Sequence, residues 1–147
     1  MNKALERLGC RTLTQEEIDS LLHEGRIARI CCYNPDGTIH ASPVWYGYED
    51  GLIKIAILRE TVKARNVRLN PQVTVLVDLI QPPRGVMIYG QAAFDTENVF
   101  NKVLKIAAKY VPDPVKAKSM MEPVWKPTDF ILNIQPTKIV SFIENSN

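Results

Sequence analysis

The residues best suited to chemistry are a threonine and several cations at the start of a short predicted helix. Thr61 and Lys63 stand in the run Thr-Val-Lys-Ala-Arg, which ends at Arg65, and the only acidic neighbour is Glu60. A helix N-terminus offers free N–H groups and a partial positive charge, to which the hydroxyl and the ammonium would add donors. This combination could bind a phosphate. On spacing alone a solvated basic face fits slightly better, because Thr-x-Lys is a weak signal.

Two strands are predicted to hold this helix in place. Isoleucines alternate with other residues over 53–57, and valines occupy every second position over 73–78, which is the period of a strand with one buried face. Thr61 is a plausible N-cap, and Asn70 followed by Pro71 is typical of a helix end. The stretch therefore predicts a strand, a basic helix and a second strand.

The rest of the chain predicts an antiparallel barrel. Thr14 and Glu17 form a capping box at the start of an amphipathic helix. We expect helices over 14–25, from Asp95 or Thr96 to Tyr110 and over 115–121, and strands over 26–33, 38–48, 86–94 and 129–143. Six or seven strands with helices inserted at two points predict a mainly β fold with α additions, closed into a barrel. We expect one domain over residues 1–147, with 1–12 and 144–147 loosely held.

Prolines and exposed apolar residues mark irregular positions. Pro43 cannot donate to a sheet ladder, so a bulge or an edge strand is expected there, and Pro136 predicts a kink. Met120, Met121 and Trp125 fall in an irregular segment. They fit either a lid packed on the core, which is the commoner case, or a wall of a ligand pocket contributed across a dimer.

Composition and charge exclude several classes of protein. A net charge of +2 over 147 residues does not indicate nucleic-acid binding, and we find no basic run interleaved with aromatic residues. No apolar run approaches membrane-spanning length, and the N-terminus lacks the pattern of a signal peptide. We therefore expect a cytoplasmic protein that binds neither nucleic acid nor a membrane.

The cysteines and histidines do not have the spacing of a metal site. Cys31 and Cys32 are adjacent, and neither His23 nor His40 stands in a ligand pattern with them. In a strand the two thiols would point to opposite faces, so we expect small packing residues in a reducing compartment, with a redox-active vicinal disulfide as the less favoured alternative. No nucleophile–base pair, paired carboxylates or nucleotide-binding glycine motif is evident. Because the sequence offers few catalytic groups but does offer a candidate phosphate site, we expect a bound cofactor to carry out the chemistry.

Four stretches resemble, in order and spacing, the pyridoxamine 5′-phosphate oxidase-like FMN-binding split barrel family. They are Gly-Arg-Ile-Ala-Arg-Ile at 25–30, Asp-Gly-Thr-Ile-His-Ala-Ser-Pro-Val-Trp at 36–45, the run from Thr61 to Asp78, and Val-Met-Ile-Tyr-Gly-Gln-Ala at 86–92. The resemblance covers roughly residues 13–143. It implies an antiparallel split β-barrel and a homodimer that binds FMN, or in one branch the deazaflavin F420, in a groove between two subunits.

The resemblance also implies a role for individual positions. Thr61 and Lys63 would hold the phosphate of the cofactor, and Arg65 could add charge to a phosphate or to a longer acidic tail. Backbone groups of Ser42, Pro43 and Val44 would run along the isoalloxazine ring, and Ile55 and Ala56 would lie beside the ring and the ribityl chain. The implied activity is a flavin-dependent oxidoreductase that transfers hydride between the cofactor and a small organic substrate. The alternative is a non-catalytic flavin-binding protein that stores or senses the cofactor.

The sequence also departs from the family pattern. The pyridoxamine phosphate oxidases have an arginine where Ser42 stands, a lysine near Gly47, and a Ser-Arg-Lys run in place of Thr61-Val-Lys63. Their C-terminal arginine and histidine signature is also absent here. These departures argue against oxidation of vitamin B6, and the helix motif is more similar to the F420 branch. A third interpretation, a nucleic-acid-binding barrel, rests only on the cations Arg59, Lys63, Arg65 and Arg68 and is the weakest.

Overall fold

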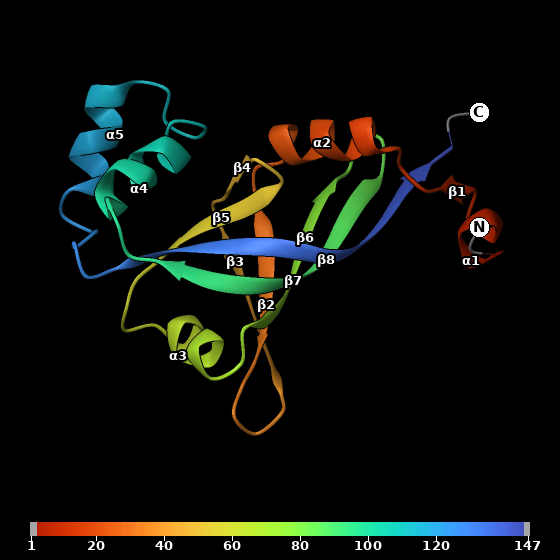
Figure 1. The fold of residues 1–147 in the computed structure, drawn as a ribbon. Helices are drawn as coiled ribbons and strands as arrows, with labels where there is room; N and C mark the ends of the chain where they lie inside the picture. The colour runs from red at the N-terminus through yellow and green to blue at the C-terminus, as the bar shows by residue number, and fades with distance from the viewer. Residues whose placement is uncertain (1–2, 146–147) are drawn as a thin grey trace.

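The computed structural model describes residues 3–145 as one antiparallel sheet with helices placed around it (Figure 1). The helices are α1 (Lys3–Arg7), α2 (Gln15–Glu24), α3 (Val62–Leu69), α4 (Val99–Ala107) and α5 (Pro114–Met121). The strands are β1 (Cys10–Arg11), β2 (Ala28–Tyr33), β3 (Ile39–Val44), β4 (Gly47–Glu49), β5 (Leu52–Ile57), β6 (Gln72–Leu79), β7 (Arg84–Asp95) and β8 (Phe130–Glu144). The prediction of a mainly β fold with α additions is confirmed.

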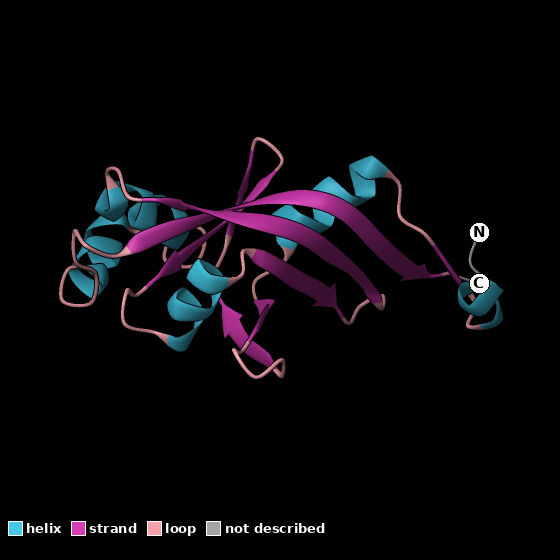
Figure 2. Ribbon diagram, turned by 60° about the horizontal axis from the view of Figure 1, so that its bottom comes forward, coloured by secondary structure: helices cyan, strands magenta, loops and turns pink. Residues whose placement is uncertain are grey.

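The sheet follows an open path. Its order is β3-β2-β6-β7-β8-β5-β4, and β1 adds a short pair to β8. The long strands β7 and β8 cross the molecule, with α4 and α5 at one end and α1 near the other (Figures 1 and 2). The predicted closed barrel therefore differs from the structure, in which β3 and β4 stand at opposite ends of the path. No helix among residues 3–145 is long and apolar enough to span a bilayer.

The alternating apolar residues pack one face of this sheet into the core. Ile53, Ile55 and Ile57 of β5 are each at most 1% exposed, as are Val75 and Val77 of β6. They form one buried cluster with residues of β2, β7 and β8. The predicted strand faces are confirmed, because a period of two places every second side chain on the same side.

The predicted strand over 38–48 is broken in the structure. Between the end of β3 and the start of β4, the ring of Tyr46 turns into the core and is fully buried. Its hydroxyl donates to the carbonyl of Leu22 over 2.6 Å, which satisfies the buried oxygen. Pro43 lies on β3, the edge strand, and pairs in register with Arg29, so the expected edge is found without a bulge.

The kink predicted at Pro136 is a bulge in β8. Tyr89 pairs with Lys138 and Gly90 with Pro136, so Thr137 is the extra residue. A Cβ atom on Gly90 would lie 2.7 Å from Ile134 Cγ2 and 2.8 Å from the carbonyl oxygen of Gln135. Glycine is therefore required where β7 passes this bulge.

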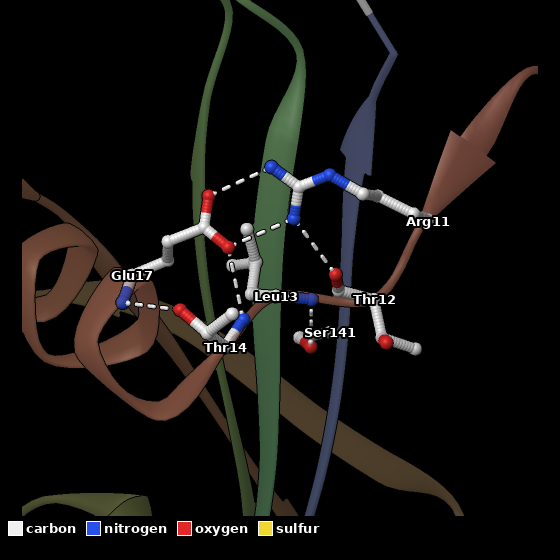
Figure 3. A network of polar contacts seen from close by, with 6 residues as sticks. All are labelled: Arg11, Thr12, Leu13, Thr14, Glu17 and Ser141. Carbon is white, nitrogen blue, oxygen red and sulfur yellow. Dashed lines mark hydrogen bonds and ion pairs between the residues drawn. The ribbon is translucent and has the colours of Figure 1, made fainter.

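Residues 3–12 contain the helix α1, which has no buried residue, and the short strand β1. β1 pairs with the end of β8, and Arg11 forms two hydrogen bonds to Glu17, of 2.8 and 2.9 Å (Figure 3). Glu17 also completes the predicted capping box of α2 with Thr14. Residues 1–2 and 146–147, the ends of the two segments expected to be loose, lie outside the described residues.

The start of α4 differs from the prediction. Its N-cap is Asn98, in a left-handed conformation with φ of 51° and no capping hydrogen bond from its side chain. Asp95 instead accepts from the backbone N–H of Glu97 and from the Lys102 ammonium, which explains why it does not cap the helix. The apolar face predicted for this helix is confirmed, since Val99, Val103, Ile106 and Ala107 are buried.

Candidate functional site

Two strand edges remain unpaired at the ends of the sheet path, within the part of the chain that the structure describes. β3 pairs with β2 alone. β4 pairs with β5 only over Leu52–Lys54, so residues 55–57 have β8 on one side and no strand on the other. Ser42–Val44 lie on the first edge, and Ile55 and Ala56 lie on the second. Backbone N–H and C=O groups on such edges are free to bind a ligand.

Residues from the two unpaired edges meet at one apolar cavity of about 220 Å³. Val44 and Trp45 line it from the β3 side, and Ala56 lines it from β5. The remaining walls come from α4, α5 and the turn that follows, through Val103, Ile106, Ala107, Met121 and Trp125. Met121 and Trp125 therefore belong to a pocket wall, whereas Met120 is 43% exposed and does not line this cavity.

The aromatic side chain at the break after β3 is fixed by stacking. The rings of Trp45 and Tyr110 lie 4.3 Å apart between centroids, and their planes are 5° from parallel. The Tyr110 hydroxyl accepts from the backbone N–H of Tyr46 over 3.0 Å. The segment after α4 thus holds the chain where it leaves the edge strand.

Ser42 offers a side-chain hydroxyl to a ligand in this region, whereas Ile55 offers only its backbone groups. The Ser42 Oγ is buried and has no hydrogen-bond partner among the described residues, and the same is true of His40 Nδ1 two positions earlier. Buried polar atoms are rarely left unpaired, so these two atoms are candidates for contact with a bound molecule. The side chain of Ile55 is wholly buried in the core, and only its backbone can face a ligand.

The start of α3 differs in one respect from the predicted phosphate site. The Thr61 hydroxyl donates to the Leu58 carbonyl over 2.8 Å and accepts from the Ala64 N–H over 3.3 Å, so it is engaged within its own turn. The predicted N-cap is confirmed. The N–H groups of Val62 and Lys63 have no acceptor among the described residues, and these are the donors that remain for an anion.

The cations of α3 differ in their surroundings. Lys63 is half-buried and has no carboxylate within 4.0 Å in residues 3–145. Arg65 donates to the Asn66 side chain over 3.1 Å, and its guanidinium is otherwise exposed. Arg68 lies over Phe130, with its Cζ 4.9 Å from the ring centroid. Lys63 and Arg65 thus fit the predicted cationic site, while Arg68 packs on an aromatic ring.

Two buried polar residues that sequence reasoning missed position this helix. Asn66 is fully buried and donates to Asn34 Oδ1 over 2.8 Å, which ties α3 to the turn between β2 and β3. Asp129 is 2% exposed and accepts from the N–H groups of Arg59 and Lys126, both over 2.8 Å. Asn66 lies with Ala64 and Val67 on the buried side of α3, so the helical spacing could have indicated its burial. No local pattern indicates the partners of Asp129.

The described residues contain no group of three or more His, Cys, Asp or Glu side chains that could hold a metal ion. Cys31 and Cys32 are free thiols on opposite faces of β2, the first half-buried and the second buried. The burial of Cys32 agrees with the predicted packing role of this thiol.

Comparisons with known proteins add a family and a fold. A family model described as pyridoxamine 5′-phosphate oxidase matches residues 14–141. A conserved hypothetical protein from Mycobacterium tuberculosis has a similar structure, with a TM-score of 0.75, 23% identity, and coverage of 90% of this chain and 86% of that chain. An FAD-binding protein from Mesorhizobium loti gives a TM-score of 0.72, 22% identity, and coverage of 92% and 99%. A structure described as F420 reductase has a TM-score of 0.64 and 22% identity, and the match covers 82% of this chain and 94% of that chain. No curated protein matches the chain.

Proposed function

We propose a function from one premise, which is that the chain belongs to the pyridoxamine 5′-phosphate oxidase family. The protein binds FMN, or alternatively F420, and serves as an oxidoreductase toward a small organic substrate. One observation carries this proposal: Val44 of β3 and Ala56 of β5, which lie on the two unpaired strand edges, line the same apolar cavity. β5 then leads within five residues to the helix start whose N–H groups are free.

The phosphate of the cofactor is assigned to the start of α3. The N–H groups of Val62 and Lys63 and the Lys63 ammonium are unpaired donors at the positive end of the helix. Thr61 contributes by fixing the turn, because its hydroxyl already bonds Leu58 and Ala64. Arg65 has guanidinium nitrogens to spare and would serve a longer acidic tail.

The ring system is assigned to the region between the two open edges. Backbone groups of Ser42, Pro43 and Val44 on one side, and of Ile55 and Ala56 on the other, would contact it. The Ser42 hydroxyl, which is buried without a partner, would supply a side-chain hydrogen bond. When bound, the flavin supplies the hydride chemistry. The residues of this chain position it, exclude water through Trp45 and the walls from α4 and α5, and orient polar groups toward it.

The proposal includes a homodimer, since the cavity at the open edges is small for a flavin at about 220 Å³ and a second subunit would enlarge and cover the site. The non-catalytic alternative, a storage or sensor protein, would bind the cofactor in the same way. Turnover of reduced cofactor with a candidate substrate separates the two, because a storage protein would bind without turning over.

Titration of the purified protein with FMN and with F420, followed by absorbance and fluorescence, tests the proposal. We expect micromolar uptake of one cofactor and a loss of affinity of about tenfold or more in Lys63→Ala, because a charge-assisted contact to phosphate is removed. Lys116→Ala is the matched control, since Lys116 is an exposed lysine that lines neither the apolar cavity nor the start of α3. Absence of uptake of both cofactors, or equal affinity in the two variants, would contradict the proposal.

A further inference from the structure

A second and larger cavity, of about 380 Å³, lies between α4 and the β4–β5 hairpin, with the end of α2 as its third wall. Leu22, Ile106 and Ile131 make it apolar on several sides. Its polar lining is dominated by lysines, which come from β5, from α4 and from the turn after α4: Lys54, Lys102, Lys105 and Lys109. Glu49 is the one carboxylate among the lining residues. The lining therefore carries a net positive charge.

The four lysines fall into two pairs. Lys102 lies 2.6 Å from Asp95, and Lys105 lies 2.7 Å from Glu49, so the charges of these two are compensated. Lys54 and Lys109 have no carboxylate within 4.0 Å in the part of the chain that the structure describes. Both therefore line the cavity without a salt bridge, and Lys54 interacts with Glu49 and Asp95 only at longer range.

Lys109 is held in an environment that disfavours its own charge. Its Nζ lies 3.8 Å from the centroid of the Tyr46 ring, and among the described residues the only hydrogen bond of this ammonium is a long one, of 3.4 Å, to the Leu22 carbonyl. Burial, and then the nearby Arg26 guanidinium, lower its pKa to about 8. An ammonium has three donors, so two remain without an acceptor. A half-buried lysine with unused donors in a cavity is the pattern of a binding group.

We propose that this cavity binds a small organic anion, bearing a carboxylate or a phosphate, whose charge is held by Lys54 and Lys109. The apolar part of the ligand would rest on Ile106 and Ile131. The volume suits a ligand of one ring with its anionic group. Ile106 also lines the smaller cavity at the open edges, so the two sites adjoin. The anion site does not depend on the flavin proposal, because none of the residues assigned to the flavin phosphate lines it.

Calorimetric titration of the cofactor-free protein with three probes tests this site. Benzoate and phenyl phosphate carry the two candidate anionic groups, and benzyl alcohol is their uncharged counterpart. We expect at least one anion to bind in the micromolar to millimolar range, and the stronger of the two identifies the preferred group. We expect Lys54→Gln and Lys109→Gln each to weaken that binding about tenfold, and Lys116→Gln to leave it unchanged.

Several results would overturn the proposal. They are no binding of either anion at millimolar concentration, binding of benzyl alcohol as strong as that of benzoate, or equal binding in the lysine variants and the control. Circular dichroism and thermal melting verify that each variant is folded. If Lys109→Gln fails to fold, Lys54→Gln decides, because Lys54 lies on a strand and its side chain makes none of the core contacts that Lys109 makes with Tyr46. Binding that persists in Lys63→Ala separates this site from the flavin site.

Discussion

Trp45 and Tyr110 stack in parallel, and the Tyr110 hydroxyl bonds both backbone groups of Tyr46, accepting from its N–H over 3.0 Å and donating to its carbonyl over 3.2 Å. These contacts join the end of α4 to the break between β3 and β4. The break determines where the first open edge stops, so the pair helps to shape the candidate site.

Tyr110→Phe is expected to destabilise the protein by about 1 kcal/mol, because the Tyr46 N–H would lose its acceptor while the ring stack remains. Urea unfolding gives the change in the free energy of unfolding. Tyr33→Phe is the matched control, since Tyr33 is 45% exposed and makes no hydrogen bond through its hydroxyl in the described residues. Equal stability of the two variants would show that this contact contributes nothing.

Asp129→Ala is expected to cost about 3 kcal/mol, because it leaves the N–H groups of Arg59 and Lys126 without acceptors at a buried position. Asp129→Asn keeps one acceptor oxygen and should cost less. The free energies of unfolding of the two variants, measured in urea, give this order. A milder loss in Asp129→Ala than in Asp129→Asn would contradict the assigned role.

Glu17→Gln is expected to flatten the acid limb of the stability curve. Hydrogen bonds from Arg11, and then from the backbone of Thr14, lower the pKa of Glu17 to about 2, against its ordinary 4.5. Stability from a lowered carboxyl pKa is present above the unfolded value and is lost as the pH falls from about 4.5 toward 2. Unfolding in urea at a series of pH values measures the slope. Glu16→Gln should keep the wild-type slope, because Glu16 is exposed and forms no ion pair within residues 3–145.

Lys109→Met is expected to remove a rise in stability on the alkaline side. The native pKa of Lys109 is lowered to about 8 and its ordinary value is 10.5, so the unfolded chain binds more protons between these values. Stability of the wild type should therefore increase as the pH rises from about 8. Burial raises the pKa of Tyr46 and Tyr48, whose contributions are lost above their ordinary value of 10.0, so the rise is clearest below that pH. Thermal melts across this range measure it, with Lys116→Met as the control. The same rise in Lys109→Met would exclude Lys109 as its cause.

The parts of the fold that local chemistry determines could be predicted from the sequence. The alternating isoleucines of β5 identify its buried face, and Thr14 with Glu17 identifies the start of α2, because both depend on residues close in the chain. The helix start at Thr61 was predicted for the same reason. The engagement of its hydroxyl by Leu58 depends on the shape of the preceding turn, which no spacing indicates.

Features that depend on distant segments could not be predicted. Asp129 binds the N–H of Arg59, 70 positions away, and Lys109 lies over a ring that belongs to the break after β3. The break itself follows from the burial of Tyr46 beneath Leu22, a contact between α2 and the chain after β3. The lysine-lined cavity was missed because its lysines come from two elements whose proximity is set by the sheet order.

The sheet order also has a consequence for how the chain assembles. β3 and β4 are separated by two residues in the sequence, yet they stand at opposite ends of the sheet path. β8 alone joins the two halves, because it pairs with β7 on one side and β5 on the other. The complete sheet therefore cannot form until residues 130–144 have been synthesised, because β8 is the strand on which both halves pair.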